Sequence, residues 1–142
     1  MSTTIDEIKS IGIEYEHELV RILKNKNFTA CRLPGSAAQS PDVLAGDGDS
    51  VMVFEVKSTR DSRIKIRKRQ IWTLKRYANA LKADPWLALK FVERDFRWLF
   101  VKISALKSHE KTFSIDYNSA CLSGFDIGEL ISNELQQRLN CQ

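Results

Sequence analysis

Two short apolar runs, separated by a turn of glycine and aspartate, constrain the fold of this chain more than any other feature. They cover residues 42–45 and 51–57, and the turn between them contains Gly46 and Gly48. Runs of this length bounded by turn residues predict a β-hairpin. Each run carries a carboxylate at the end away from the turn, Asp42 in the first and Glu55 in the second. The hairpin therefore predicts that these two acids converge.

The second run also carries a lysine beside its carboxylate. Side chains alternate between the two faces of a strand, so Glu55 and Lys57 share one side while Phe54 and Val56 share the other. Charged groups at the end of a buried strand must be paired, solvated or bound to a metal ion. One alternative is a plain Glu–Lys salt bridge on an edge strand. Converging carboxylates suit a hard divalent cation such as Mg²⁺, and a neighbouring lysine suits a phosphate, so the pattern favours a metal-dependent nuclease.

The size and composition of the chain are those of one globular domain. A chain of 142 residues can bury a sufficient hydrophobic core without disulfide bonds or structural metal ions. We expect residues 1–142 to form a single nuclease domain. The hydrophobic share of 43% and the charged share of 28% exclude a disordered or fibrous class. The net charge of +4 and the pI near 9.0 favour a polyanionic partner.

The cysteines and the start of the chain bear on its location. Cys31, Cys121 and Cys141 are widely spaced without a CxxC pair, which supports neither a zinc site nor a disulfide framework. We expect reduced thiols, two of them filling the core. The first seven residues lack a signal-peptide pattern, and no run approaches the ~18 apolar residues of a membrane span. The sequence predicts a cytoplasmic protein that does not engage a membrane.

A helix is predicted over residues 12–26, because its apolar residues fall on one stripe. The stripe consists of Ile13, Leu19, Val20 and Leu23. Glu16 projects into the middle of this stripe, whereas Glu14 and Glu18 are expected on the outer face. Glu16 is then either a surface or capping residue of the first turn or, if the stripe packs beside Asp42 and Glu55, a third acidic member of the site.

A loop of small residues and a strongly basic segment flank the predicted hairpin. The loop over residues 34–40 follows a predicted strand at 28–33 and is either an ordinary turn or part of the site. The segment 60–69 holds a single acid and six cations: Arg60, Arg63, Lys65, Arg67, Lys68 and Arg69. Such a density of positive charge suits phosphate binding. The alternative is a solvated start of the next helix, whose apolar stripe runs from Ile71 to Leu81 and ends before Asp84 and Pro85.

The remaining third of the chain shows scaffold patterns. Residues 86–92 and 96–102 are predicted as two strands around a turn, packed in the core or in a dimer. Residues 104–124 are polar and are expected to be irregular. Asp126 and Glu129 have the spacing of a capping box, which predicts an amphipathic helix to the end of the chain.

Taken in order, these motifs resemble the archaeal Holliday-junction resolvases of the restriction-endonuclease-like PD-(D/E)xK superfamily. The resemblance covers about residues 12–70 and consists of Gly12-x-x-x-Glu16, Phe28, Arg32-x-Pro34-x-Ser36, Pro41-Asp42-Val43 and Glu55-Val56-Lys57-Ser58. The chain departs from the family pattern at Asn27, where glycine often precedes the aromatic residue. The loop from Ser36 to Asp42 is also shorter and lacks the basic residues of some members.

The resemblance implies an α/β fold, with a central mixed β-sheet flanked by helices, and a two-fold homodimer. It implies a crossover junction endodeoxyribonuclease that makes paired symmetric cuts in four-way DNA, in recombination and repair. Mg²⁺, with Mn²⁺ as a substitute, would bind at Glu16, Asp42 and Glu55. Lys57 would act in catalysis and Ser36 beside the scissile phosphate. The residues that would bind the DNA backbone are Arg32, Arg60, Arg63, Lys65, Arg67, Lys68 and Arg69.

Two other functions fit the same residues. The first is another PD-(D/E)xK nuclease that acts on linear, nicked or flapped DNA. The second is a non-catalytic DNA-binding module, in which the acidic cluster is structural and the basic run does the binding. The sequence does not identify a replication or recombination protein that recruits the enzyme.

Overall fold

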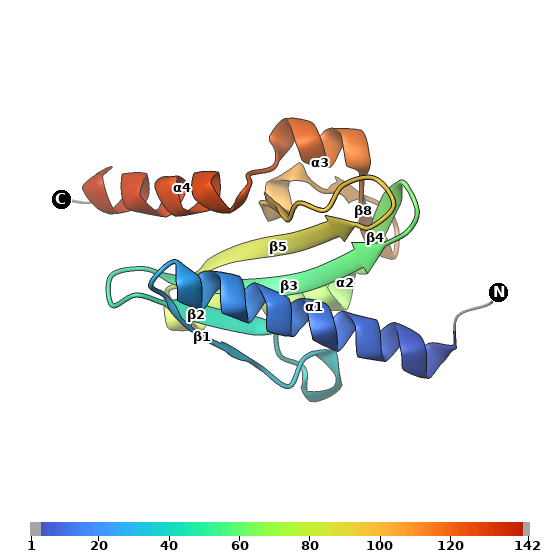
Figure 1. The fold of residues 1–142 in the computed structure, drawn as a ribbon, viewed down its shortest axis with the longest axis horizontal. Helices are drawn as coiled ribbons and strands as arrows, with labels where there is room; N and C mark the ends of the chain where they lie inside the picture. Colours follow the sequence, from blue (N-terminus) through green and yellow to red (C-terminus); the bar gives the residue numbers. More distant parts are fainter. Residues whose placement is uncertain (1–3, 141–142) are drawn as a thin grey trace.

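The structure is a computed structural model, which describes residues 4–140 (Figure 1). Its centre is a five-stranded sheet in the order β1-β2-β3-β5-β6. The strands are β1 (Thr29–Arg32), β2 (Val43–Gly46), β3 (Val51–Thr59), β5 (Asp84–Phe91) and β6 (Leu99–Val101). β3 pairs with β5 in parallel, and every other neighbouring pair in this sheet is antiparallel. The predicted α/β fold with a mixed central sheet is therefore confirmed.

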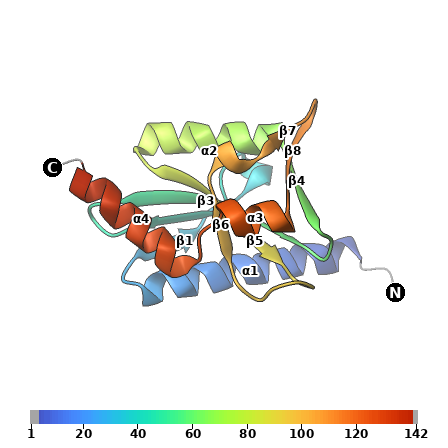
Figure 2. The same cartoon turned by 90° about the horizontal axis from the view of Figure 1, so that it is seen from above.

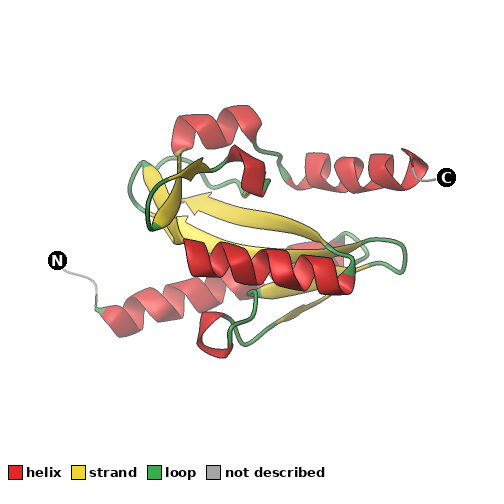
Figure 3. Ribbon diagram, turned by 180° about the vertical axis from the view of Figure 1, so that it is seen from behind, coloured by secondary structure: helices red, strands yellow, loops and turns green. Residues whose placement is uncertain are grey.

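Helices cover both faces of this sheet. α1 (Ile5–Asn25) lies along one face and buries Leu19 and Leu23 there, as Figures 1 and 2 show. α2 (Lys68–Leu81) crosses the opposite face, seen from behind in Figure 3, and buries Ile71 and Leu74. Each face thus has its own cluster of buried side chains, with β3 between them. The C-terminal helix α4 (Ile127–Asn140) adds Leu130 to the cluster under α1.

A second, three-stranded sheet packs against the α2 side of the molecule. It has the order β4-β8-β7, with β4 (Arg63–Arg67), β8 (Thr112–Asp116) and β7 (Lys107–Ser108). Ile64 and Ile66 of β4 are buried in the α2 cluster, while the alternate side chains of the strand are exposed. The short helix α3 (Tyr117–Ser123) and the 3-10 turns Ser36–Ala38 and Ile103–Ala105 complete the fold.

The edge of the main sheet at β6 is closed. Phe100 donates its N–H to the carbonyl of Phe125 and accepts the N–H of Phe125 in return, both at 2.8 Å. The two residues form an isolated antiparallel bridge, and Phe125 itself lies outside the named strands. A short extended piece after α3 therefore covers the outer side of β6.

α1 begins earlier than the sequence analysis predicted. Thr4 and Glu7 form a capping box that fixes the first turn, so the helix starts at Ile5 rather than near residue 12. The buried stripe is correct at Leu19 and Leu23, but Ile13 is 42% exposed.

The prediction that Glu18 lies on the outer, solvent-facing side of α1 is also wrong. Its carboxylate lies 2.8 Å from the ammonium of Lys90 and accepts a hydrogen bond of 2.9 Å from the indole of Trp98. Lys90 is almost fully buried, and its charge also lies over the rings of Tyr15 and Trp98. Glu18 therefore ties α1 to the sheet instead of facing solvent.

Several boundaries after the predicted hairpin differ from the expectation. Residues 63–67 form a strand before α2, and residues 104–124, expected to be irregular, contain β7, β8 and α3. Asp84 and Pro85 do not follow the helix as a loop but begin β5. Pro85 is tolerated because β6 pairs only with residues 87–89 of that strand, so no neighbour on that side needs its missing N–H.

Two further expectations concern the cysteines and the last helix. Cys31 and Cys121 are exposed, so the prediction that two cysteines fill the core is wrong for these residues, and Cys141 lies outside the described part of the chain. The predicted capping box is present, because Asp126 and Glu129 exchange hydrogen bonds between side chain and backbone. Among the helices that the structure describes, none is long and apolar enough to cross a bilayer.

Candidate active site

The predicted hairpin brings its two carboxylates together at the point where β2 begins. Asp42 immediately precedes β2, and its Oδ2 accepts a hydrogen bond of 2.9 Å from the backbone N–H of Val56 in β3. Its own N–H donates to the carbonyl of Phe54 at 2.9 Å. These two bonds fix Asp42 against β3 beside Glu55, as the spacing of the two apolar runs predicted.

Glu55 and Lys57 lie on one side of β3, as strand alternation predicted. The ammonium of Lys57 is 3.9 Å from Oε1 of Glu55, and Glu55 is only 3% exposed. This residue sits in the middle of a nine-residue strand, which pairs with β5 from Met52 to Thr59. The arrangement differs from a salt bridge on an edge strand, because the carboxylate is buried and has a second carboxylate, Asp42, within interaction distance.

The electrostatics of this pair favour a bound cation. Burial and the negative charge of Asp42 raise the pKa of Glu55, although Lys57 opposes the shift. Burial also raises the pKa of Asp42, against the hydrogen bond from Val56 and the charge of Lys57. A buried and a half-buried carboxylate with one neighbouring lysine would carry excess negative charge if both were ionised, which a proton or a metal ion neutralises.

Glu16 approaches the pair from α1, the helix on the opposite face of the sheet. Burial and the charge of Asp42 raise the pKa of Glu16 to about 7, while Arg32 lowers it. Nε of Arg32 lies 3.5 Å from Oε1 of Glu16, and another nitrogen of its guanidinium lies 3.4 Å from the ring of His17. Arg32, predicted as a DNA-binding residue, is thus paired with an acid of the site.

The loop before Asp42 is shaped to hold that carboxylate. Gly35 has φ +82°, and a Cβ at this position would lie 3.1 Å from Oδ1 of Asp42. The buried hydroxyl of Ser40 accepts the N–H of Gly35 at 2.7 Å, which closes the loop into a compact turn. The predicted site residue Ser36 begins the 3-10 turn inside this loop and is exposed.

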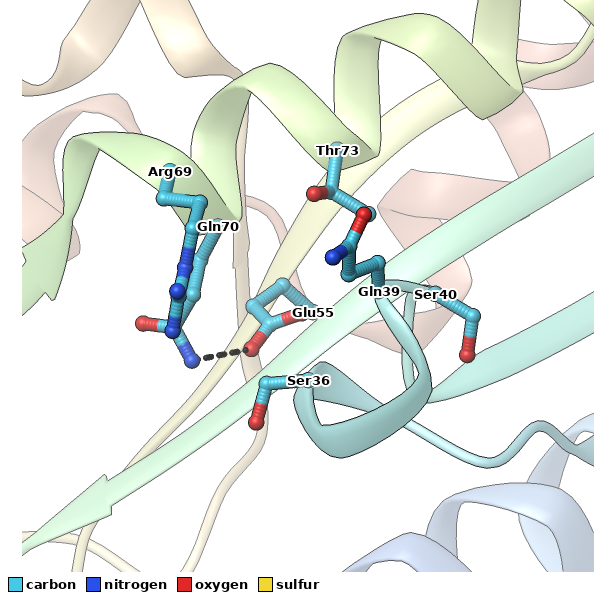
Figure 4. A pocket seen from close by; sticks show the side chains of 7 residues that line it. All are labelled: Ser36, Gln39, Ser40, Glu55, Arg69, Gln70 and Thr73. Carbon is cyan, nitrogen blue, oxygen red and sulfur yellow. Dashed lines mark hydrogen bonds between the residues drawn. The ribbon is translucent and has the colours of Figure 1, made fainter.

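A small cleft separates this loop from α2. Its lining includes Ser36, Glu55 and three residues of α2: Arg69, Gln70 and Thr73. Figure 4 shows Arg69 and Gln70 side by side on the first turn of α2, with Ser36 across from them and the Glu55 carboxylate between. The amide nitrogen of Gln70 donates a hydrogen bond of 3.2 Å to Oε1 of Glu55. The cleft therefore joins a predicted phosphate-binding serine, a cation and a carboxylate of the pair.

The other predicted DNA-binding cations do not line this cleft. Arg63, Lys65 and Arg67 alternate with buried isoleucines along β4 and are exposed. Arg60 is exposed in the turn after β3, and the ammonium of Lys68 lies 5.5 Å from the ring centre of Phe113. The basic segment is thus mainly the outward face of a strand, and it runs directly into the first turn of α2.

The donor set fits a hard divalent ion with few protein ligands. In the part of the chain that the structure describes, no group of three or more His, Cys, Asp or Glu side chains is gathered tightly enough to enclose a metal ion. Asp42 and Glu55 form a pair, and Gly35 leaves open the space beside Oδ1 of Asp42. Mg²⁺ is commonly held by one or two carboxylates, with waters and substrate phosphates as its other ligands. The pair therefore suits such an ion.

Comparison with known proteins agrees with these motifs. The family described as archaeal Holliday junction resolvase (Hjc) matches residues 7–139. The chain belongs to the archaeal Holliday junction resolvase family. It is 29% identical over 134 residues to crossover junction endodeoxyribonuclease Hjc of Archaeoglobus fulgidus. The aligned segment covers 92% of this chain and 96% of the relative. It is 31% identical over 109 residues to the Hje enzyme of Sulfolobus acidocaldarius, covering 73% of this chain and 78% of the relative.

A solved structure shares the fold. The crystal structure of Archaeoglobus fulgidus Hjc, a Holliday junction resolvase, superimposes with a TM-score of 0.75 at 29% sequence identity and covers 84% of this chain and 93% of that one. The predicted family and the predicted nuclease fold are thereby confirmed. The motifs that indicated the family lie within residues 12–70. The family model matches a longer segment, which includes the last third of this resolvase-family chain.

Sequence reasoning missed two polar contacts in this family member, the hydrogen bond from Gln70 to Glu55 and the ion pair of Glu18 with Lys90. Gln70 stands three residues after the N-cap residue Arg67 of α2, where glutamine is a capping signal, but that signal does not indicate its second bond to Glu55. Glu18 was placed outside, and nothing in the local sequence indicated its partner Lys90, which lies 72 residues further along the chain.

Proposed function

We propose that this chain is a structure-selective endodeoxyribonuclease that resolves four-way DNA junctions by paired cuts, in recombination and repair. The observation that carries the proposal is the pair of the half-buried Asp42 and the buried Glu55, with Lys57 3.9 Å from Glu55, in a chain that belongs to the resolvase family. The relatives are named crossover junction endodeoxyribonucleases. Their names and this geometry support the same chemistry, the hydrolysis of a phosphodiester.

Asp42 and Glu55 are proposed to hold Mg²⁺, with Mn²⁺ as a substitute, and Glu16 to bind a water of that ion or a second ion. A divalent ion at such a site lowers the pKa of a water and polarises the phosphate. The chain itself fixes the orientation of the two carboxylates, through the Val56 N–H for Asp42 and the Gln70 amide for Glu55. Fixed acceptors of this kind need little rearrangement when the cation binds.

Lys57 is proposed to orient the attacking water and to balance negative charge that develops on the phosphoryl group. Its ammonium lies beside Glu55, on the same side of β3. Ser36, exposed at the mouth of the cleft, is proposed to donate its hydroxyl to the phosphate. Arg69 lines the same cleft and supplies a positive charge opposite Ser36.

The DNA backbone is proposed to lie along the outward face of β4 and the start of α2. The exposed side chains of Arg63, Lys65 and Arg67 occupy alternate positions of that strand, which gives a spaced row of cations. Arg60 and Lys68 flank this strand in the sequence and are proposed to add to the same surface. Arg69, which lines the cleft with Glu55, and Arg32, which is paired with Glu16, are proposed to contact phosphates nearer the carboxylates. Because contacts to phosphates carry no sequence information, selectivity is proposed to come from the shape of the junction.

A homodimer is proposed because paired cuts in opposed strands need two copies of one site. A two-fold axis places two identical sites on the two matching strands of a symmetric junction. The described part of the chain supplies one pair of neighbouring carboxylates at a site of this kind. The cytoplasmic location stays a prediction.

The test is cleavage of a labelled synthetic four-way junction beside linear duplex of the same sequence, with Mg²⁺ and with EDTA. We expect metal-dependent, paired, symmetric cuts confined to the junction. Equal cutting of both substrates would instead indicate a general nuclease of the superfamily. Salt-sensitive binding without cleavage in any divalent ion would indicate a DNA-binding module.

A further inference from the structure

The side chain of Gln70 uses both ends of its amide. Its Oε1 accepts the backbone N–H of Arg67 at 3.3 Å, which caps the first turn of α2. Its Nε2 donates to Oε1 of Glu55 at 3.2 Å, as the dashed line in Figure 4 shows. One side chain thus spans from the end of the basic strand β4 to a carboxylate of the site.

Capping alone does not account for a glutamine here. Glutamate serves equally as the acceptor at this position of a capping box, and its negative charge suits the N-terminus of a helix better. Of these two side chains, the amide of glutamine can accept from Arg67 and also donate to a carboxylate, whereas an ionised glutamate can only accept. The property that distinguishes glutamine from glutamate is therefore the bond to Glu55.

The bond also matters because of where Glu55 lies. Glu55 is buried beside the carboxyl group of Asp42, and the ammonium of Lys57 is 3.9 Å away, beyond ordinary hydrogen-bond distance. An amide donor stabilises the ionised carboxylate and fixes one of its oxygens, which leaves the other oxygen oriented. Donors that orient metal-binding carboxylates in this way are known to affect metal affinity and activity.

We propose that Gln70 is a positioning residue that holds the Glu55 carboxylate in the orientation required to bind a divalent cation, and that it links this carboxylate to the DNA-binding segment of β4 and α2. The inference rests on the proposed function, because it assigns Glu55 to a metal site. The link consists of two consecutive hydrogen bonds, from the Arg67 backbone to Gln70 and from Gln70 to Glu55. DNA held by the cations around Arg67 would therefore be connected to the orientation of the carboxylate.

Two variants of Gln70 and one control distinguish the bond to the Arg67 N–H from the bond to Glu55. Gln70→Met keeps the length of the side chain and removes both bonds. Gln70→Glu keeps the acceptor for the Arg67 N–H and removes the donor to Glu55. Asn79→Ala, the matched control, removes an exposed amide from the last turn of the same helix.

The first measurement is direct binding of Mn²⁺ to the full chain without DNA, followed by electron paramagnetic resonance of the free ion. We expect Gln70→Met to bind Mn²⁺ about 10- to 100-fold more weakly than the parent and Asn79→Ala to bind it as the parent does. A Gln70→Met protein whose dissociation constant for Mn²⁺ lies within about twofold of the parent value would overturn the inference. This readout does not depend on cleavage, so it stands even if the parent fails to cut a junction.

The second measurement is single-turnover cleavage of the four-way junction at increasing Mg²⁺, with junction affinity measured separately in EDTA. Both Gln70 variants should cleave about 10- to 100-fold more slowly at limiting Mg²⁺, with affinity for the junction in EDTA unchanged. A purely structural cap predicts a different result, in which Gln70→Glu cleaves as the parent does and Gln70→Met only lowers the midpoint of thermal unfolding. That result would overturn the inference, whereas a parent that does not cut in Mg²⁺ would overturn the proposed function.

Discussion

The carboxylate of Asp42 accepts a hydrogen bond of 2.9 Å from the backbone N–H of Val56, the residue that follows Glu55 in β3. Strand β2 begins only at Val43, so a side chain provides the acceptor for β3 at this point. The orientation of the first acid of the site is therefore set by the backbone of the strand that carries the second. A substitution at Asp42 that keeps the acceptor for the Val56 N–H therefore tests catalysis alone, whereas one that removes the acceptor also disturbs the fold.

Asp42→Asn should lower junction cleavage by roughly a hundredfold or more while the chain stays folded. The amide oxygen of asparagine can still accept the N–H of Val56, and removing one charge relieves repulsion between two acids. Single-turnover cleavage and thermal unfolding in EDTA test both expectations. The exposed Glu93→Gln serves as the control, and an Asp42→Asn protein that cuts at the parent rate would contradict the assignment.

The stability of the metal-free protein should fall as the pH rises from the ordinary pKa of glutamate, 4.5, through about 7. Glu16, Asp42 and Glu55 all have raised pKa values in the fold, so the native state holds protons that the unfolded chain has released. Added Mg²⁺ should raise the unfolding midpoint, more at high pH than at low pH, because the ion competes with protons for the same carboxylates.

Thermal unfolding in EDTA and in Mg²⁺, from about pH 5 to about pH 8, checks this dependence. Glu55→Gln should flatten the pH dependence and reduce the effect of Mg²⁺. A parent protein whose stability rises steadily over this range in EDTA would show that the three carboxyl groups are not protonated in the fold as described.

Lys57→Met should slow cleavage and move its pH dependence to higher pH. The charge of Lys57 lowers the pKa of both Asp42 and Glu55, so its removal raises both values and makes the carboxylates harder to ionise. The rate of single-turnover cleavage against pH, at fixed Mg²⁺, measures this shift. A rate that falls equally at every pH would assign Lys57 to the attacking water alone.

Glu18→Gln should destabilise the fold and leave cleavage by the folded protein unchanged. The substitution removes the carboxylate that pairs with the buried Lys90 at 2.8 Å. Because Glu18 is itself partly exposed, we expect a loss of only about 1–2 kcal/mol. Chemical denaturation of Glu18→Gln beside the exposed control Glu14→Gln measures the difference, and equal stabilities would show that Lys90 is satisfied by the aromatic rings alone.

Lys65→Ala should weaken junction binding about equally for junctions of different sequence and should reduce the slope of log affinity against log salt by about one phosphate contact. Lys65 is exposed in the middle of β4, between two buried isoleucines, so its loss leaves the packing intact. Binding titrations in EDTA at several salt concentrations give the slope. Arg94→Ala, an exposed cation in the loop after β5, should leave the slope as in the parent.

The sequence allowed the central features to be predicted where they depend on nearby residues. The hairpin, the convergence of Asp42 with Glu55 and the shared side of Glu55 and Lys57 follow from strand alternation and a short turn, both of which are local. The assignment of roles to these residues remains a prediction, because the comparisons establish the family and the fold but not the function of each side chain.

The features that were missed depend on partners far away in the chain. β4 was not predicted as a strand: its segment was interpreted as a phosphate-binding run or, alternatively, as the solvated start of the next helix. It becomes a strand by pairing with β8, about 50 residues later. Lys90 turns Glu18 inward, and no periodicity within α1 indicates that. The early start of α1 is different, since Thr4 and Glu7 carry a local capping signal that the apolar stripe obscured.

The closed edge at β6 limits how two copies of this chain can meet. Within β6, Phe100 has its outward N–H and carbonyl already bonded to Phe125. A second copy therefore finds no free strand edge there, and a β-sheet running continuously from one subunit into the other cannot form through β6. Of the two outer strands of the main sheet, only β1 remains for such a continuation, and any other pairing of subunits must use the second sheet, helices or side-chain surfaces.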